Sequence, residues 1–125
     1  MLGDKEAVAT LAVKDLAAAR KFYEGKLGLT PLDTQGEEAV TYKSGGSRVI
    51  VYRSQFAGTN KATAANWFVG KDLERIVAAL AERGVPFEHY DLPGLTRTGH
   101  IHGAGDFKSA WLKDPDGNII ALMNM

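Results

Sequence analysis

TLAVKDLAAARKFYEGKLGL at Thr10–Leu29 determines the predicted fold, because it joins a strand pattern directly to a helix pattern. Ala7–Val13 is short, apolar and bounded by charged residues, which is typical of a buried strand. Asp15 is a suitable helix N-cap, and apolar residues recur behind it at helical spacing as far as Gly28, a suitable helix stop. The segment therefore predicts a strand followed at once by an amphipathic helix.

Three strand-like runs follow this helix, at Leu29–Thr34, Glu38–Lys43 and Arg48–Arg53. Ser44–Gly46 is a turn signal between the last two runs. The first module, at about residues 5–54, is thus predicted as one strand, one helix and three strands. A polar, glycine-containing connector is expected at residues 55–61.

The same order of elements then begins again, at about residues 62–125. The predicted elements are a strand at Ala62–Val69, a helix at Asp72–Gly84, a short strand at Pro86–Asp91, and strands at Phe107–Lys113 and Asn118–Asn124. Leu92–Gly105, rich in glycine, is expected to be a long irregular loop, and Asp-Pro-Asp-Gly at residues 114–117 a type I turn. The second module therefore repeats the first.

Matching residues at the helix ends support a duplication. Val13-Lys-Asp-Leu16 and Val69-Gly-Lys-Asp-Leu73 each lead into a helix, and Gly28-Leu29 and Gly84-Val85 each end one. Self-similarity at a fixed period is stronger support for an architecture than either helix alone. The alternative is that any two helices flanked by strands look alike.

Composition excludes several function classes. The 125 residues suit a single domain, and the 15 basic and 15 acidic residues leave no net charge to attract nucleic acid or an anionic membrane. The absence of cysteine excludes disulfides, thiolate metal sites and cysteine nucleophiles. Met1–Val8 has no apolar run behind a basic segment, so we expect no secretory signal and a cytoplasmic protein.

Three segments together resemble the vicinal oxygen chelate superfamily, the glyoxalase, bleomycin resistance and dioxygenase group. They are Thr10–Leu29, Asp72–Glu88 (DLERIVAALAERGVPFE) and Ala110–Leu122 (AWLKDPDGNIIAL). The resemblance implies an α+β fold of two βαβββ modules. Their curved mixed sheets would surround a cleft, with the helices on the outer faces. It also implies a homodimer that binds a small molecule.

Catalytic members of this group hold a divalent metal on His and Glu side chains from the first and last strands of the modules. The resemblance places these positions at Val8, at Ala121, and at Ala65 or Asn66. Valine and alanine have no donor atoms, so we expect no metal site of the usual kind and no cofactor.

The ligand is then expected to be held by aromatic faces and a few polar groups. Tyr42, Tyr52, Trp67 and Trp111 lie in predicted strands, and each could face either the cleft or the helices. We prefer Tyr52 and Trp67 for the cleft, with Trp111 in the core. The predicted ligand-binding residues are Thr10, Tyr52, Arg53, Asn66, Trp67, His102 and Lys108.

The three histidines leave alternatives open. His100 and His102, in the glycine-rich loop, are foremost exposed loop residues, then substrate contacts, and last a metal pair. His89, beside Glu88 and Asp91, could be a general base or a surface residue.

Three functions therefore compete. The first is a metal-independent binding protein for a small organic molecule. The second is a glyoxalase-like lyase or isomerase that uses a displaced metal or a histidine base. The third is a non-catalytic subunit or regulatory module. Fold alone does not decide among them.

Overall fold

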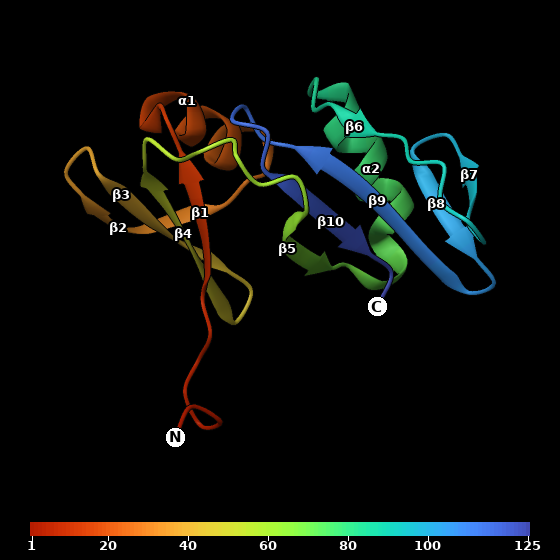
Figure 1. The fold of residues 1–125 in the computed structure, drawn as a ribbon, viewed down its shortest axis with the longest axis horizontal. Helices are drawn as coiled ribbons and strands as arrows, with labels where there is room; N and C mark the ends of the chain where they lie inside the picture. The colour runs from red at the N-terminus through yellow and green to blue at the C-terminus, as the bar shows by residue number, and fades with distance from the viewer. The chain divides into compact units, whose positions relative to one another are not determined.

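Each half of the chain builds one mixed β-sheet with one helix beside it (Figure 1). The computed structural model describes residues 1–125, which divide into units 1–57 and 58–125. Neither sheet closes on itself, and the fold is α+β. Neither helix has the length and hydropathy that crossing a bilayer would require.

The first unit has the predicted order of strand, helix and three strands. Its elements are β1 (Ala9–Val13), α1 (Leu16–Arg20) continued by the π-helical η1 (Lys21–Lys26), β2 (Thr30–Gln35), β3 (Ala39–Ser44) and β4 (Ser47–Arg53). The strands lie in the order β1-β4-β3-β2, with β1 parallel to β4 and the other pairs antiparallel.

The second unit repeats this order with additions. Its elements are β5 (Thr63–Phe68), η2 (Gly70–Asp72), α2 (Leu73–Glu82), β6 (Phe87–Glu88), β7 (Thr96–Thr98), β8 (Ile101–Ala104), β9 (Phe107–Lys113) and β10 (Ile119–Met123). The strands lie in the order β5-β10-β9-β8-β7, and β5 is parallel to β10, as β1 is to β4. The sequence repeat is therefore a repeat of the βαβββ unit.

The two helices end in the same way. Gly28 and Gly84 both have positive φ, 77° and 79°, which glycine adopts without the steric cost that a Cβ brings. At the start of α1 the Asp15 carboxylate accepts a hydrogen bond from the backbone N–H of Ala18 at 3.2 Å. These residues turn the chain between strand and helix at matching points of the two units.

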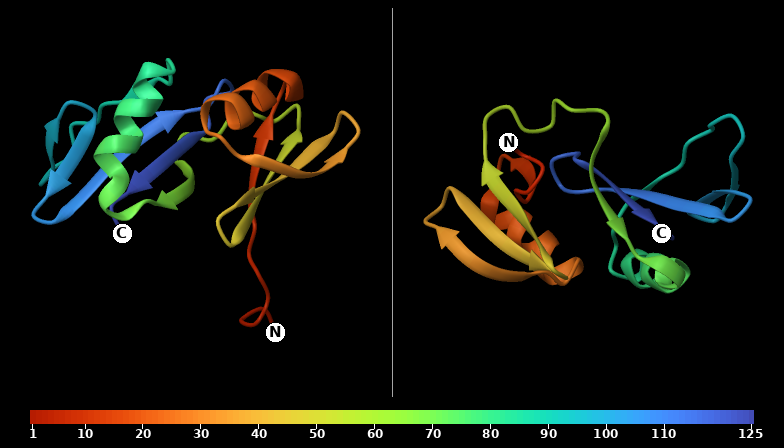
Figure 2. Two further views of the ribbon diagram at one scale, coloured as in Figure 1. Left: turned by 180° about the vertical axis from the view of Figure 1, so that it is seen from behind. Right: turned by 90° about the horizontal axis from the view of Figure 1, so that it is seen from below.

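One face of each sheet packs against its helix. In the first unit the Tyr42 hydroxyl of β3 donates to Glu24 of η1 at 2.8 Å, so Val40, Tyr42 and their cross-strand neighbours face the helix. In the second unit α2 lies against one face of the sheet (Figure 2). Lys108 of β9 pairs with Glu74 of α2 at 2.9 Å, which places the alternate residues Ala110 and Leu112 on the helix side. The opposite face of each sheet is called its open face below.

The strands β6 and β8 are two parts of one broken strand. Both pair with the same edge of β9: Glu88 is opposite Trp111, and His102 is opposite Ser109. Ile101 therefore takes the place opposite Ala110, and residues 88 and 101 occupy adjacent positions along one line. Residues 89–100 form an excursion from this line, a segment whose two ends lie close together.

The first sheet has a smaller irregularity at the corresponding point. The pairing of β2 with β3 shifts between Pro31 and Asp33, so one residue is left out of register. Pro31 is the third residue after Gly28, as Phe87 is after Gly84. The excursion thus begins where the first unit has only a bulge.

The expected irregular loop at Leu92–Gly105 is wrong for much of its length. Residues 96–98 and 101–104 form the hairpin of β7 and β8, because β9 offers a free edge to β8. The glycines read as loop signals are partly turn residues: Gly99 lies in the turn between β7 and β8, and Gly105 in the turn between β8 and β9. His102 is consequently a buried strand residue, not an exposed loop residue.

The Asp114 carboxylate holds the turn between β9 and β10. It accepts from the backbone N–H groups of Asp116 and Asn118 at 2.9 and 2.8 Å, and from the Asn118 side chain at 2.8 Å. Asp114→Ala would leave these donors unpaired, and we expect the free energy of unfolding to fall by about 2 kcal/mol in chemical denaturation. Asp106→Ala, at the exposed turn before β9, is the control and should change it by less than about 0.5 kcal/mol.

Candidate functional site

The open face of the second sheet carries a row of polar side chains across neighbouring strands. Arg97 is opposite His102, His102 is opposite Ser109, and Ser109 is opposite Met123. Directly opposed residues point to the same face of a sheet. This row, called the His102 row below, runs across β7, β8, β9 and β10.

His102 is fully buried and makes one hydrogen bond. Its Nε2 accepts from the backbone N–H of Tyr90 at 2.9 Å. A neutral imidazole that accepts at Nε2 has its proton on Nδ1, so this assignment follows from the hydrogen bond. Nδ1–H is therefore a donor, and it has no partner.

Ser109, beside His102 in the row, also has a buried polar atom without a partner. It is fully buried, and its hydroxyl has no hydrogen-bond partner. Buried polar side chains are paired in most proteins, and leaving one unpaired costs about 1–3 kcal/mol. Two such atoms on directly opposed residues of one face mark a place that is suited to a further polar group.

Two aromatic rings lie next to His102. The Trp111 ring meets the His102 ring edge-on, with centroids 5.0 Å apart, and the Tyr90 ring meets Trp111 edge-on at 5.3 Å. Both residues are partly buried, and the Tyr90 ring also lies 6.1 Å from the His102 ring. The candidate site is thus the buried pair His102 and Ser109, with two partly exposed aromatic side chains beside it.

His89 and His100 join the two ends of the excursion. His89 Nε2 and His100 Nδ1 are 2.8 Å apart, and the His100 ring stacks on Phe87 at 4.8 Å. Burial lowers the pKa of His89 below its usual value, and the positive charge of Arg97 and the neighbouring His100 lower it further. The pair therefore favours a neutral form of His89, in which one ring donates to the other.

The superfamily's metal-ligand positions lie in a different row of the second sheet. Ala121 is opposite Asn66 on one side and Trp111 on the other. Besides the Asn66 amide, this row offers only the Glu88 carboxylate opposite Trp111, and Glu88 is paired with Lys113 at 2.9 Å. Val8 in the first unit offers no donor. The chain brings together no three His, Asp or Glu residues that could share a metal ion. These residues do not fit the metal that the superfamily uses.

Thr10 and Tyr52 lie on the open face of the first sheet. Thr10 is opposite Ile50, and Tyr52 is opposite Ala12 and Ala39, so they lie on adjacent rows. The Thr10 hydroxyl donates to the Val8 carbonyl at 3.2 Å, and Tyr52 is exposed. Both remain predictions as ligand contacts.

Three other predicted residues lie toward the helices. Trp67 is opposite Leu122, on the side of Ala110 and Lys108, whereas Trp111 is on the open face. Trp67 stays a prediction as a ligand contact. Lys108 forms an ion pair with Glu74 at 2.9 Å, and Arg53 forms one with Glu38 at 2.6 Å. Of the seven predicted ligand-binding residues, only Asn66 and His102 share the open face of the second sheet.

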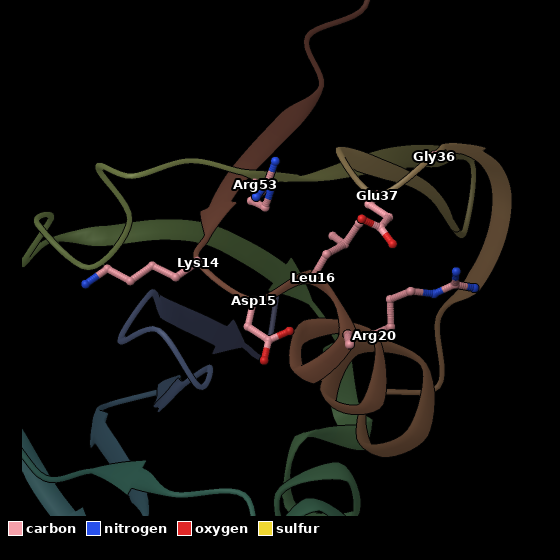
Figure 3. Close-up of a pocket in the computed structure, with 8 residues that line it drawn as sticks. Lys14, Asp15, Leu16, Arg20, Gly36, Glu37 and Arg53 are labelled. Carbon is pink, nitrogen blue, oxygen red and sulfur yellow. The ribbon is translucent and has the colours of Figure 1, made fainter.

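A solvent-open recess of about 440 Å³ lies at the start of α1 (Figure 3). Its charged residues spread around the rim without converging, and they are Lys14, Asp15, Arg20, Glu37 and Arg53. Arg20 donates to Glu24 at 2.6 Å, and Asp15 caps the helix. Because Asp15, Arg20 and Arg53 already have partners, the recess is a weaker candidate than the His102 row.

A family model places the chain in its class. The Glyoxalase/Bleomycin resistance protein/Dioxygenase superfamily model matches residues 7–122, and the chain belongs to this superfamily. No curated protein sequence matches the chain.

Solved structures share the fold at low sequence identity. A lactoylglutathione lyase from Agrobacterium tumefaciens is 17% identical with a TM-score of 0.72, covering 98% of this chain and 95% of its own. The fosfomycin resistance protein FosX from Mesorhizobium loti is 12% identical with a TM-score of 0.70, covering 100% and 94%. A glyoxalase/bleomycin resistance protein/dioxygenase from Alicyclobacillus acidocaldarius is 18% identical with a TM-score of 0.72, covering 98% and 93%.

The sequence reasoning missed Ser109, Trp111 and Tyr90 as site residues. A signal was present for two of them, because FKSAWLK alternates and places Ser109 and Trp111 on the face opposite Ala110 and Leu112. Tyr90 had no such signal, since it enters the site through the fold of the excursion and the contact of its backbone N–H with His102.

The tautomer of His102 is directly testable. We expect long-range ¹H–¹⁵N NMR spectra to show His102 protonated at Nδ1 and unprotonated at Nε2, because Nε2 accepts from Tyr90. The His102→Asn spectrum would assign the signal. A proton on Nε2 would contradict the geometry described.

The titration of His89 is a second test. Burial and Arg97 lower the pKa of His89, so its NMR titration midpoint should lie below about 6.5, and Arg97→Gln should raise it. The unfolded chain takes up this proton at a higher pH than the folded protein. The His89 contribution to stability is therefore present above about pH 6.5 and lost as the pH falls toward the lowered value.

Arg75→Gln, an exposed arginine of α2, is the control for this titration. It removes the same charge and should leave the His89 midpoint unchanged. An equal shift in both variants would mean that net charge, and not the position of Arg97, acts on His89.

Proposed function

We propose that the protein binds a small organic molecule, without metal, on the open face of its second sheet. The observation that carries the proposal is the pair of unpartnered buried atoms, Nδ1 of His102 and Oγ of Ser109. A bound molecule that bonded to both would remove the cost of leaving them unpaired.

The proton on Nδ1 limits what the ligand can present. His102 would donate, so the ligand atom beside it would be an acceptor, such as a carbonyl or carboxylate oxygen. The Ser109 hydroxyl can donate to the same group. Trp111 and Tyr90 would contact the apolar part of the ligand, since aromatic side chains offer large flat surfaces.

Binding is favoured over acid–base catalysis at this place. A general base needs a lone pair directed at the substrate proton, and the one available lone pair of neutral His102 already accepts from the Tyr90 N–H. The donor-free positions Val8 and Ala121 likewise favour binding over the metal-dependent activity of a lactoylglutathione lyase.

Ser109→Ala separates binding from folding. Because the Ser109 hydroxyl has no partner, its removal should leave the free energy of unfolding unchanged or raise it by up to about 1 kcal/mol. The same variant should weaken binding of aromatic fragments that bear a carbonyl or carboxylate oxygen by about tenfold, measured by NMR titration.

Ser47→Ala is the matched control, since the Ser47 hydroxyl already donates to the Ser44 carbonyl in the first unit. It should leave fragment binding unchanged. Loss of stability in Ser109→Ala, or fragment binding that ignores the substitution, would count against the proposal.

A further inference from the structure

We infer that the molecule bound at the His102 row is a monoanionic carboxylate with a planar apolar body, and that Arg97, His102 and Ser109 hold its carboxylate. This inference rests on the proposed function and names the class of its ligand.

The order of residues in the row is the first argument. Arg97, His102 and Ser109 are direct neighbours on three adjacent strands. Adjacent strands lie about 4.8 Å apart, so the three side chains start within about 10 Å of one another on one face. All three offer N–H or O–H donors, and none of them carries negative charge. An oxygen-rich anion is the chemical complement of such a set.

The balance of charge is the second argument. The acidic residue of the neighbouring row, Glu88, is paired with Lys113 at 2.9 Å. Arg97 forms no ion pair, and its guanidinium donates only to the Gly99 carbonyl at 2.7 Å. Arg97 therefore leaves one uncompensated positive charge beside the row. Its charge acts on His89, whose pKa it helps to lower.

The single positive charge of the row favours a carboxylate over a phosphate monoester. One cation and two neutral donors match a single negative charge and two oxygens. A dianion would bring a second charge into a place where His102 and Ser109 are fully buried, with no cation to compensate it. A monoanion fits the row better.

The surroundings of the row indicate the body of the ligand. Tyr90 and Trp111 lie against each other and are half-exposed, so a planar group could lie on them at the surface. Further along the row, Met123 is opposite Phe68, an exposed aromatic residue. The row thus passes from a cation through two donors to apolar side chains, the polarity of an aromatic acid.

The ring and the backbone of Tyr90 contribute to the site in different ways. Its ring belongs to the exposed excursion, whereas its backbone N–H bonds to His102. Because the hydrogen bond comes from the backbone, rotation of the ring would leave it in place. The donor at Nδ1 would keep its orientation as the ligand enters.

Paired probes test the inference. 2-Naphthoate and 3-phenylpropanoate carry the carboxylate, and 2-naphthamide and 3-phenylpropanamide replace it with a neutral group of similar shape. In NMR titrations of the full chain we expect the acids to shift the His102 and Ser109 signals and to bind about tenfold more tightly than their amides. Arg97→Gln should remove most of this difference, and Arg75→Gln should retain it.

The outcomes separate the inference from the proposed function. Amides that bind at His102 and Ser109 as tightly as the acids would overturn the carboxylate while leaving the site itself in place. Tighter binding of 2-naphthyl phosphate than of 2-naphthoate would also overturn the carboxylate and leave the site in place. Binding of the acids that Arg97→Gln does not weaken would do so too. If neither acids nor amides perturb the His102 and Ser109 signals, the proposed function fails as well.

Discussion

The parallel pairing of the first and last strands in each unit is the constraint on which the rest of the structure depends. Parallel strands need a crossover connection, and here the helix supplies part of it and covers one face of the sheet. Side chains alternate between faces, so the pairing of the last strand decides what every other strand presents. Leu122 faces α2 and Ala121 faces away from it. Trp111 is opposite Ala121, and His102 is opposite Ser109 on the same face, so both also lie on the face away from α2.

The order of elements could be predicted from periodicity alone, but the direction of individual side chains could not. Leu16, Ala19 and Phe22 recur on one face of a helix, which is local information. The faces taken by Trp67 and Trp111 depend on which residues pair across the sheet, and β10 shifts its register against β5 between Ile119 and Ile120. Such a shift arises when strands distant in sequence pair, and the sequence of a short apolar strand does not predict it.

The candidate site was partly accessible to sequence reasoning. Val8 and Ala121 could be recognised as positions without donor atoms, because chemistry at those positions needs specific side chains. His102 could be named but not placed, since a glycine-rich segment conceals a strand when its partner is distant in sequence. Ser109 matters because it lacks a partner, and only the packed structure shows which polar atoms remain unpaired.

The broken strand of the second sheet has an evolutionary consequence. Glu88 and Ile101 occupy consecutive places beside β9, so the ladder would keep its register if the intervening residues were replaced by a segment of another length. Lengthening a surface loop adds little entropy cost, because that cost grows only logarithmically with its length. The segment supplies Tyr90 and Arg97, whereas His102 and Ser109 lie outside it on β8 and β9. Residues 89–100 could therefore be replaced as a unit during evolution, which would change the ligand that the site binds and leave the pairing of the remaining strands unchanged.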